Sequence, residues 1–563
     1  MERRECDVLV AGSGAGGFSA AITAAHHGLD VLMVEKEPEF GGTTAYSAGV
    51  VWIPMNEAGV AAKLADSPAE VMRYLEAEVG AFLARPKAEA FIANAAPMLA
   101  FFERETHVRY LLMGAWSDYH PELPGASQGG RSLLPLPYDG RELGDWFRKL
   151  RAPIRTMMLF GGMSVGRDDI PHLLNVSRSP RSAWHVAKLL ARYALDRLSY
   201  PRGTRIANGN ALIARMAKSA FEKKVALWLE SPLVRLTKAG ERVTGAVVKR
   251  DGYEIEVVAR RGVVLACGGF PRNEEWRGRY YRHVAAGKNH VPLAPPGNTG
   301  DGVRAAQAAG GVLFTEQDQP AAWTPVSLVP QADGSTVPFP HFIDRCKPGY
   351  IAVDRRGLRF ANEADSYHDF MPRLFAACEG DAAVEAFLLC DHRAIRRYGM
   401  GVAPPSPMPL GPHLANGYLV RADTPAELAA KLGIDAAGLE RTLARWNAHA
   451  ARGEDPDFGK GTNAYHRFGG DPLHQPNPNI APIVDAPYYA VRLVPSDLGT
   501  FIGLATDAQS RVLDVNERPV PGLYAAGNDQ ASVMGGKYPG AGITIGPAMT
   551  FGWIAARHIA GVP

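Results

Sequence analysis

The first forty residues constrain the fold of this chain more than any other feature. A short apolar run, residues 7–11, leads into a turn with GxGxxG spacing, whose glycines are Gly12, Gly14 and Gly17. A helical stretch follows, and then a second apolar run that leads directly to Glu35. In such a unit the glycines permit a tight turn, a close approach by a pyrophosphate and close packing of helix on strand, while the acid bonds a ribose hydroxyl. The pattern predicts a Rossmann-like dinucleotide-binding domain.

Three further glycine-rich segments indicate which dinucleotide is bound. They are FGGTTAYSAG at 40–49, VVLACGGF at 263–270 and GLYAAGN at 522–528. Together with the first motif they resemble the FAD signatures of the fumarate reductase and succinate dehydrogenase flavoprotein superfamily, although Asn528 stands where that superfamily usually has Asp. Succinate dehydrogenases link the flavin to a histidine in the early loop. No histidine occurs between 41 and 49, so the resemblance implies non-covalent FAD.

The same resemblance implies a set of cofactor contacts. Val234 is expected near the adenine, and the other contacts fall in the glycine-rich segments and beside them. The full set is Gly12, Gly14, Ala15, Gly17, Glu35, Lys36, Gly41, Gly42, Thr43, Thr44, Ser47, Gly49, Val234, Gly268, Gly527, Asn528 and Ile543.

A nucleotide domain built from both ends of a chain implies that something is inserted in the middle. We predict an α/β fold, with a Rossmann-like FAD-binding domain split in sequence, an inserted α+β substrate domain and a basic helical insert. The predicted bounds are 1–275 and 485–563 for the two FAD-binding parts, 276–484 for the substrate domain, and about 85–210 for the helical insert.

Local patterns support this division. Residues 225–270 read as five successive strands separated by turn residues, and we assign them to the FAD-binding domain. Within the substrate domain, proline-rich loops alternate with helical stretches at 424–433 and 436–451.

The net charge of +3 for 563 residues conceals one basic region. Residues 148–205 hold twelve Lys and Arg and only three acids, which is +9, so the rest of the chain is −6. This region carries several apolar and aromatic side chains, and residues 182–198 form an amphipathic helical pattern. Two interpretations stay open: peripheral contact with an anionic membrane, or a helix packed on the protein with a solvated basic face. Nothing in the charge favours a nucleic-acid partner.

The five cysteines are widely spread, and no pair has CxxC spacing. We therefore expect no disulfide framework, no zinc site and no iron–sulfur cluster, and the histidines form no metal-binding pattern. We also expect no signal peptide and no transmembrane helix, because the chain has no cleavable apolar core near its start and no apolar run of about 18 residues. These features favour a cytoplasmic protein, with membrane association at the inner face as the alternative.

The C-terminal segment carries the strongest chemical signal. A glycine-rich loop, residues 533–544, leads into a long apolar helix whose N-terminus offers free N–H groups and a positive dipole end. The motif Tyr-Pro-Gly-Ala-Gly at 538–542 is similar to the YPGPG motif of 3-ketosteroid Δ1-dehydrogenases, and the resemblance covers nearly the whole chain. It implies that Tyr538 and the Gly542 N–H polarise a steroid 3-ketone. It also implies that Tyr367 is the general base and Tyr119 its supporting tyrosine, and that Tyr465 lines the same cavity.

The implied reaction needs no metal. A tyrosine, poised towards its anion by a neighbour, removes the proton from carbon 2 of the 3-ketosteroid, and a hydride passes from carbon 1 to flavin N5. Electrons would then leave to an external acceptor such as a quinone, because the sequence holds only one dinucleotide motif. Three alternatives stay open: a ketosteroid Δ4-dehydrogenase, a fumarate-reductase-like flavoenzyme, which would need an arginine-rich pocket, and a non-catalytic FAD-fold binding module.

Overall fold

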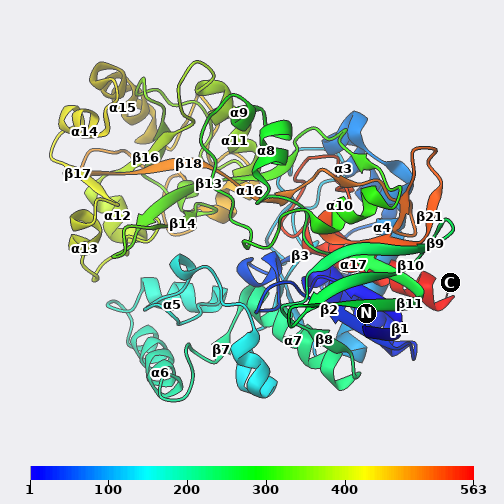
Figure 1. Cartoon of the computed structure of the whole chain (residues 1–563). Helices are drawn as coiled ribbons and strands as arrows, with labels where there is room; N and C mark the ends of the chain where they lie inside the picture. Colours follow the sequence, from blue (N-terminus) through cyan, green and yellow to red (C-terminus); the bar gives the residue numbers. More distant parts are fainter. Residues whose placement is uncertain (1, 563) are drawn as a thin grey trace.

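Two β-sheets with different strand arrangements organise the chain in the computed structural model, which describes residues 2–562 (Figure 1). The first sheet runs β20-β21-β11-β1-β2-β8, with β10 and β9 added beside β11. Its central strands are parallel. The strands are β1 (Glu2–Ala11), β2 (Val31–Val34), β8 (Ala226–Trp228), β9 (Leu233–Ala239), β10 (Arg242–Arg250), β11 (Tyr253–Leu265), β20 (Arg511–Leu513) and β21 (Pro519–Ala525).

Parallel strands covered on both faces explain the apolar runs in the sequence. All four residues of β2 and the last four of β1 are buried, as expected for strands enclosed by helices on one face and further elements on the other. Three helices that pack together cover one face: α1 (Ala15–His26), α7 (Asn208–Glu222) and α17 (Ile545–Ala560). The split nucleotide domain thus brings both ends of the chain into one core.

The strand prediction for 225–270 was wrong in one place. The last two predicted strands form a single strand, β11, because β1 pairs with it from Glu2 onwards, far beyond the buried part of the sheet. The pairing of β1 with β11 shifts register between Cys6 and Val8, opposite residues 259–262, where the sequence pattern suggested a break between two strands.

The second sheet is antiparallel and runs β14-β13-β18-β16-β15, with β17 beside β18. Its strands are β13 (Ala321–Pro330), β14 (Thr336–Pro340), β15 (Tyr350–Val353), β16 (Ala386–Cys390), β17 (Val420–Ala422) and β18 (Tyr488–Thr500). Helices pack on it, among them α11 (Tyr367–Ala377), α14 (Pro425–Leu432) and α15 (Ala436–Ala450), and the last two match the helical stretches expected from the sequence. Since β18 pairs with β13 and β16, the chain returns to the first sheet after Thr500, later than the predicted boundary at 485.

The helical insert starts later than the sequence pattern suggested. Helix α4 (Arg85–Glu105) packs on α17 and contributes buried side chains to the main core, so it belongs to the nucleotide domain. The protruding part carries η4 (Arg155–Met157), α5 (Ile170–Leu174) and α6 (Pro180–Asp196), and appears in cyan at the lower left of Figure 1. Within residues 2–562, no helix has the length and apolar character needed to cross a membrane.

Candidate active site

One large cavity runs between the two sheets and begins at the first glycine-rich turn. Gly12 has a φ of +105°, and a Cβ atom there would lie 2.1 Å from the Ala266 carbonyl oxygen. A Cβ on Gly17 would lie 2.0 Å from the Gly12 oxygen, so the backbone of helix α1 packs directly against the backbone of the turn. Gly14 is different, because its Cβ would meet nothing nearer than the Thr44 hydroxyl at 3.7 Å, on the side that opens into the cavity. The turn therefore has the shape that a pyrophosphate needs.

This difference between the glycines predicts two separable phenotypes. Gly12→Ala should lower the thermal unfolding midpoint of the cofactor-free protein, because the methyl group overlaps backbone and φ is unfavourable. Gly14→Ala should leave that midpoint nearly unchanged but lower FAD affinity by about tenfold or more, because its methyl group occupies the space of the pyrophosphate. Thermal melts and fluorescence titration with FAD measure both. Equal loss of stability in the two variants would contradict this view of the turn.

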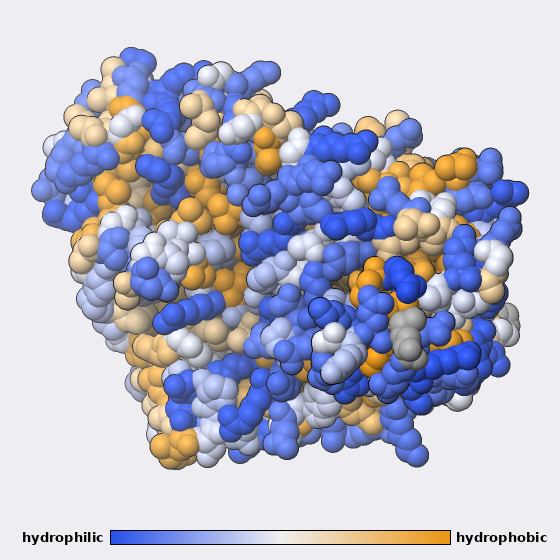
Figure 2. Space-filling model, in the orientation of Figure 1, coloured by the Kyte–Doolittle hydropathy of each residue, from blue (hydrophilic) through white to orange (hydrophobic). Residues whose placement is uncertain are grey.

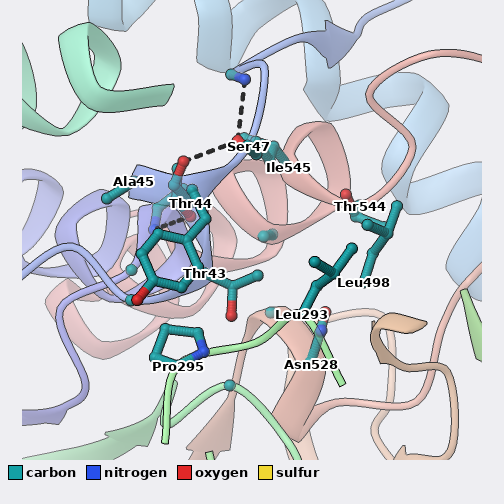
Figure 3. A pocket seen from close by; sticks show the side chains of 18 of the residues that line it. Thr43, Thr44, Ala45, Ser47, Leu293, Pro295, Leu498, Asn528, Thr544 and Ile545 are labelled. Atoms are coloured by element: carbon teal, nitrogen blue, oxygen red, sulfur yellow. Dashed lines mark hydrogen bonds between the residues drawn. The ribbon is translucent and has the colours of Figure 1, made fainter. Parts of the chain in front are cut away.

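The ribose end is organised by Glu35 and Lys36. Ser13 donates two hydrogen bonds to Glu35 Oε2, from its hydroxyl at 2.5 Å and its N–H at 3.2 Å. Lys36 Nζ pairs with Asp301 Oδ2 at 2.6 Å. Beyond them, Thr44 and Ser47 lie on the loop that borders the cavity, where the Ser47 hydroxyl donates to the Thr44 carbonyl at 2.7 Å (Figure 3). Small hydroxyl side chains thus follow the path expected for a pyrophosphate and ribityl chain.

Thirteen of the seventeen predicted cofactor residues line this cavity. They are Gly12, Gly14, Ala15, Glu35, Lys36, Gly42, Thr43, Thr44, Ser47, Gly49, Gly268, Gly527 and Asn528. Gly17 and Gly41 lie behind the lining and shape the turns. Ile543 borders a small neighbouring cavity, and Ile545 takes the lining position. The expected contact at Val234 shifts by one residue: the Val234 side chain is 45% exposed, and Leu233 lines the cavity instead. The reason is that alternate residues of β9 face opposite sides of the sheet.

Two polar side chains that the sequence analysis missed hold the cofactor loops together. Asn298 donates to the Thr43 hydroxyl at 3.0 Å and to the Gly268 carbonyl at 3.1 Å. Asp529 accepts from the N–H groups of Cys267 at 2.7 Å and Gly269 at 2.9 Å, and burial raises its pKa to about 6. The signals were the run GNTGDG at 297–302, and an acid directly after Asn528.

At the other end of the cavity, four tyrosines from distant segments converge. The ring of Tyr119 stacks on Tyr538 with centroids 5.6 Å apart, and Tyr367 meets Tyr538 edge-on at 5.2 Å. The Tyr119 hydroxyl donates to that of Tyr367 at 3.3 Å, and the Tyr465 ring lies 4.5 Å from Tyr119. All four side chains line the cavity, as does Gly542. The residues expected to act together are therefore neighbours.

Burial keeps these hydroxyls neutral. Burial raises the pKa of Tyr119, Tyr367 and Tyr465 well above the ordinary tyrosine value, and that of Tyr538 is raised as well. The neighbouring tyrosines raise the pKa of Tyr367 further. In the chain without bound ligand, the neighbours of Tyr367 favour its neutral form. The expectation that a neighbour poises this tyrosine towards its anion stays a prediction for the complex with substrate.

The loop 538–542 is fixed by its carbonyl groups. The Pro539 oxygen accepts from the Tyr119 N–H at 2.9 Å and the Tyr74 hydroxyl at 2.6 Å. The Ala541 oxygen accepts from the Ser132 hydroxyl at 3.0 Å. Gly542 has a φ of +98°, and a Cβ there would lie 2.5 Å from the Val51 backbone, so no other residue fits. With its carbonyls tied to the scaffold, the loop leaves Tyr538 and Gly542 at the cavity beside the N-terminus of α17.

Apart from the nucleotide end, the cavity lining carries no charged side chain among the described residues. Its charged lining residues all lie around the nucleotide end, where Lys36 pairs with Asp301, and Arg151 lies 3.5 Å from Glu37. The remaining arm is lined by side chains without charge, from Trp116, Ile154, Met157, Pro340, Phe342, Ile343 and Leu498. This arm suits an apolar molecule with a polar group at the tyrosine end.

His368 and Cys267 lie near the two ends of the cavity, and each bonds to neighbouring parts of the fold. His368 is buried with its pKa lowered to about 4, and it bonds the Trp323 N–H and the Gly536 carbonyl, so it has a structural role beside Tyr538. Cys267 lines the cavity next to Gly268, its thiol donates to the Ala11 carbonyl at 3.4 Å, and burial raises its pKa well above the ordinary value. Within the described residues, no cluster of acids, histidines or cysteines is arranged to hold a metal ion.

Known proteins similar to this chain include flavoenzymes, as the cavity suggests. The sequence matches the family described as an FAD binding domain over residues 7–545. A 4-oxocyclohex-2-ene-1-carboxylate 5-dehydrogenase of Sinomonas cyclohexanicum is 42% identical over 99% of this chain and 94% of its own. A 3-oxosteroid 1-dehydrogenase of Mycobacterium tuberculosis is 37% identical over 100% of this chain and 99% of its own. The crystal structure of a 3-ketosteroid Δ1-dehydrogenase from Sterolibacterium denitrificans, in complex with 1,4-androstadiene-3,17-dione, superposes with a TM-score of 0.90 at 39% identity and 99% coverage of both chains.

Fold and site thus define an FAD-dependent oxidoreductase. The chain belongs to the FAD-binding-domain family and, within it, to the family of the 3-oxosteroid 1-dehydrogenases.

Proposed function

We propose that this protein is a 3-ketosteroid Δ1-dehydrogenase. The observation that carries the proposal is the cluster of Tyr119, Tyr367, Tyr538 and Gly542 at the inner end of an uncharged, apolar arm of the cavity. In the proposal the Tyr538 hydroxyl and the Gly542 N–H donate to the 3-ketone oxygen and acidify the hydrogens on carbon 2. Tyr367, once deprotonated, takes one of these protons, and the Tyr119 hydroxyl, 3.3 Å away, donates a hydrogen bond that stabilises the Tyr367 anion beforehand.

FAD, when bound non-covalently, supplies the acceptor for the hydride that leaves carbon 1. The chain would hold it through the α1 turn, Glu35 and the loop 43–47, and Asn298 and Asp529 would keep the surrounding loops in place. The N-terminus of α17 faces the same region and favours negative charge there. The apolar arm excludes water from the reacting end, which strengthens each of these polar interactions.

A ring carboxylate is the competing substrate class, because one relative acts on 4-oxocyclohex-2-ene-1-carboxylate. Such a substrate places a carboxylate across the ring from its ketone, where a cation or several donors would be needed. The arm beyond the tyrosines instead presents side chains such as Trp116, Phe342 and Leu498. The steroid is therefore the better fit.

Anaerobic mixing of the FAD-loaded protein with three ketones tests the proposal. A 3-keto-4-ene steroid should bleach the flavin and give the 1,4-diene, and a saturated 5α-3-ketosteroid should give the 1-ene. A Δ4-dehydrogenase would leave the first untouched and turn the second into the 4-ene. Preference for 4-oxocyclohex-2-ene-1-carboxylate by kcat/KM would overturn the steroid assignment.

We also propose that the protruding insert docks on an anionic membrane. On α6 and just beyond it, Trp184, Leu195 and Leu198 are 68%, 68% and 82% exposed. Val186 is the one buried residue of the apolar face expected from the sequence, which comprises Ala183, Val186, Leu190, Ala194 and Leu198. Apolar atoms gather at the lower left of Figure 2, where α6 lies. Basic side chains flank them in a segment of net charge +9, which complements anionic headgroups. Ile154 and Met157 of the same insert line the substrate arm, so docking would place its entrance near the bilayer, and near quinones as the proposed electron acceptors.

Vesicle sedimentation checks the docking. Leu198→Glu should lower the fraction bound to vesicles containing phosphatidylglycerol by about fivefold or more, since it places an anion in the apolar face. Leu473→Glu is the matched control, because Leu473 is 81% exposed but lies in the other domain. Neutral phosphatidylcholine vesicles should bind the wild type weakly. Equal binding by the two variants would contradict this orientation.

A further inference from the structure

His120 lies between two carboxylates that come from different domains. Its Nδ1 is 2.8 Å from Glu78 Oε2, and its Nε2 is 3.0 Å from Asp369 Oδ2. Glu78 lies on α3 (Pro68–Val79) of the nucleotide domain, whereas Asp369 lies on α11 beside the second sheet. The imidazole therefore bridges the domain boundary.

This bridge is adjacent in sequence to both members of the hydroxyl pair. Tyr119 directly precedes His120, and Tyr367 lies two residues before Asp369 at the start of α11. The Tyr119–Tyr367 hydroxyl contact of 3.3 Å and the His120–Asp369 contact of 3.0 Å therefore join the same two segments. A displacement of α11 that broke one contact would change the other.

The bridge is partly shielded and stays charged. The side chains of His120, Glu78 and Asp369 are 24%, 7% and 28% exposed. Burial disfavours the His120 cation, but the hydrogen bond to Asp369 and the ionic contact with Glu78 outweigh it and raise its pKa to about 11. Burial likewise opposes ionisation of Asp369, but the His120 contact holds its pKa at about 2. Two polar neighbours complete the surroundings: Ser366 donates to Asp369, and Tyr74 accepts from the His120 N–H at 3.4 Å.

We propose that His120 is a positioning residue, an ionic clamp that holds α11 against the Tyr119 segment and thereby sets the distance between the Tyr119 and Tyr367 hydroxyls. The importance of that distance for turnover rests on the function proposed above, but the clamp itself is a property of the folded chain. His120 does not line the cavity, so it acts through the two tyrosines.

His120→Asn in the FAD-loaded protein tests the clamp, because asparagine keeps a polar side chain but cannot carry the charge. We expect kcat to fall by about 10–100-fold, since a displacement of about 1 Å at a reacting group has costs of that order, with KM within about twofold. Asp369→Asn should act in the same direction, and His120→Arg, which keeps the cation, should recover part of the loss. The matched control is His107→Asn, which removes a histidine 2.7 Å from Glu222 within the nucleotide domain and should keep wild-type kcat.

Two further measurements separate positioning from folding and from the choice of substrate. His120→Asn should keep the FAD content of His107→Asn. Its unfolding midpoint should fall, because Glu78 and Asp369 lose their counter-charge, but it should stay well above the assay temperature. A fall in kcat that only follows lost FAD or unfolded protein would overturn the proposal. Nitrogen NMR of the histidine-labelled wild type at pH 9 should show an imidazolium signal that is absent from His120→Asn. If the wild type oxidises no ketone, the proposed function fails, but the imidazolium signal still tests the clamp. Absence of that signal from the wild type would overturn the clamp proposal.

Discussion

Tyr538→Phe is expected to lower kcat/KM for a 3-keto-4-ene steroid by about 100- to 1,000-fold, the range found when one donor to a developing oxyanion is removed. The ring would stay in place, because Tyr538 packs against Tyr119 and Tyr367 on two sides. The Gly542 N–H would remain as the other donor, so activity should be residual and not zero. Stopped-flow flavin bleaching at several steroid concentrations measures the loss.

The control for this variant is Tyr253→Phe, since Tyr253 is 75% exposed on the nucleotide domain and should tolerate the change. FAD content should equal that of the wild type in both variants. If Tyr538→Phe loses FAD along with activity, Tyr538 has a structural role at the flavin, and the ketone must be held by other donors.

The nucleotide end could be read from the sequence because its determinants are local. The turn at Gly12, its helix and Glu35 occupy one short segment, and steric rules specify what each position must be. Asp529 could not be predicted in this way, because the motif places the expected Asp position at Asn528. Only the hydrogen bonds from the N–H groups of Cys267 and Gly269 show that Asp529, the next residue, fixes the 267–269 loop.

The substrate arm could not be read in the same way. Trp116, Ile154, Phe342 and Leu498 are apolar residues from four distant segments, and nothing in their local patterns distinguishes them from ordinary core. The same limit applies to β18, because its alternation identifies a strand but not the sheet in which it pairs. The His120 clamp likewise depends on a meeting of α3 and α11 that only tertiary structure provides.

Tyr367→Phe is expected to lower kcat by about 100- to 10,000-fold, the usual range for a general base, while KM changes little. Because burial raises the pKa of Tyr367, the wild type holds the phenol over the neutral range. An acid with a raised pKa yields its basic form only as pH increases, so wild-type kcat/KM should still be rising near pH 9, towards and beyond the ordinary tyrosine value of about 10. A profile that peaks below pH 7 would exclude a tyrosine base.

Deuterium at carbon 2 separates this role from that of Tyr538. Without the Tyr367 hydroxyl, proton removal should limit the rate, so the carbon-2 isotope effect on kcat should increase above that of the wild type. Tyr465→Phe is the matched comparison, because it removes a hydroxyl from the same cavity, where its ring lies 4.5 Å from Tyr119. It should cost less than about tenfold and leave the isotope effect unchanged. The reverse order, with Tyr465→Phe the slower enzyme, would move the base from α11 to the Tyr465 segment and would remove the catalytic reason for the His120 clamp.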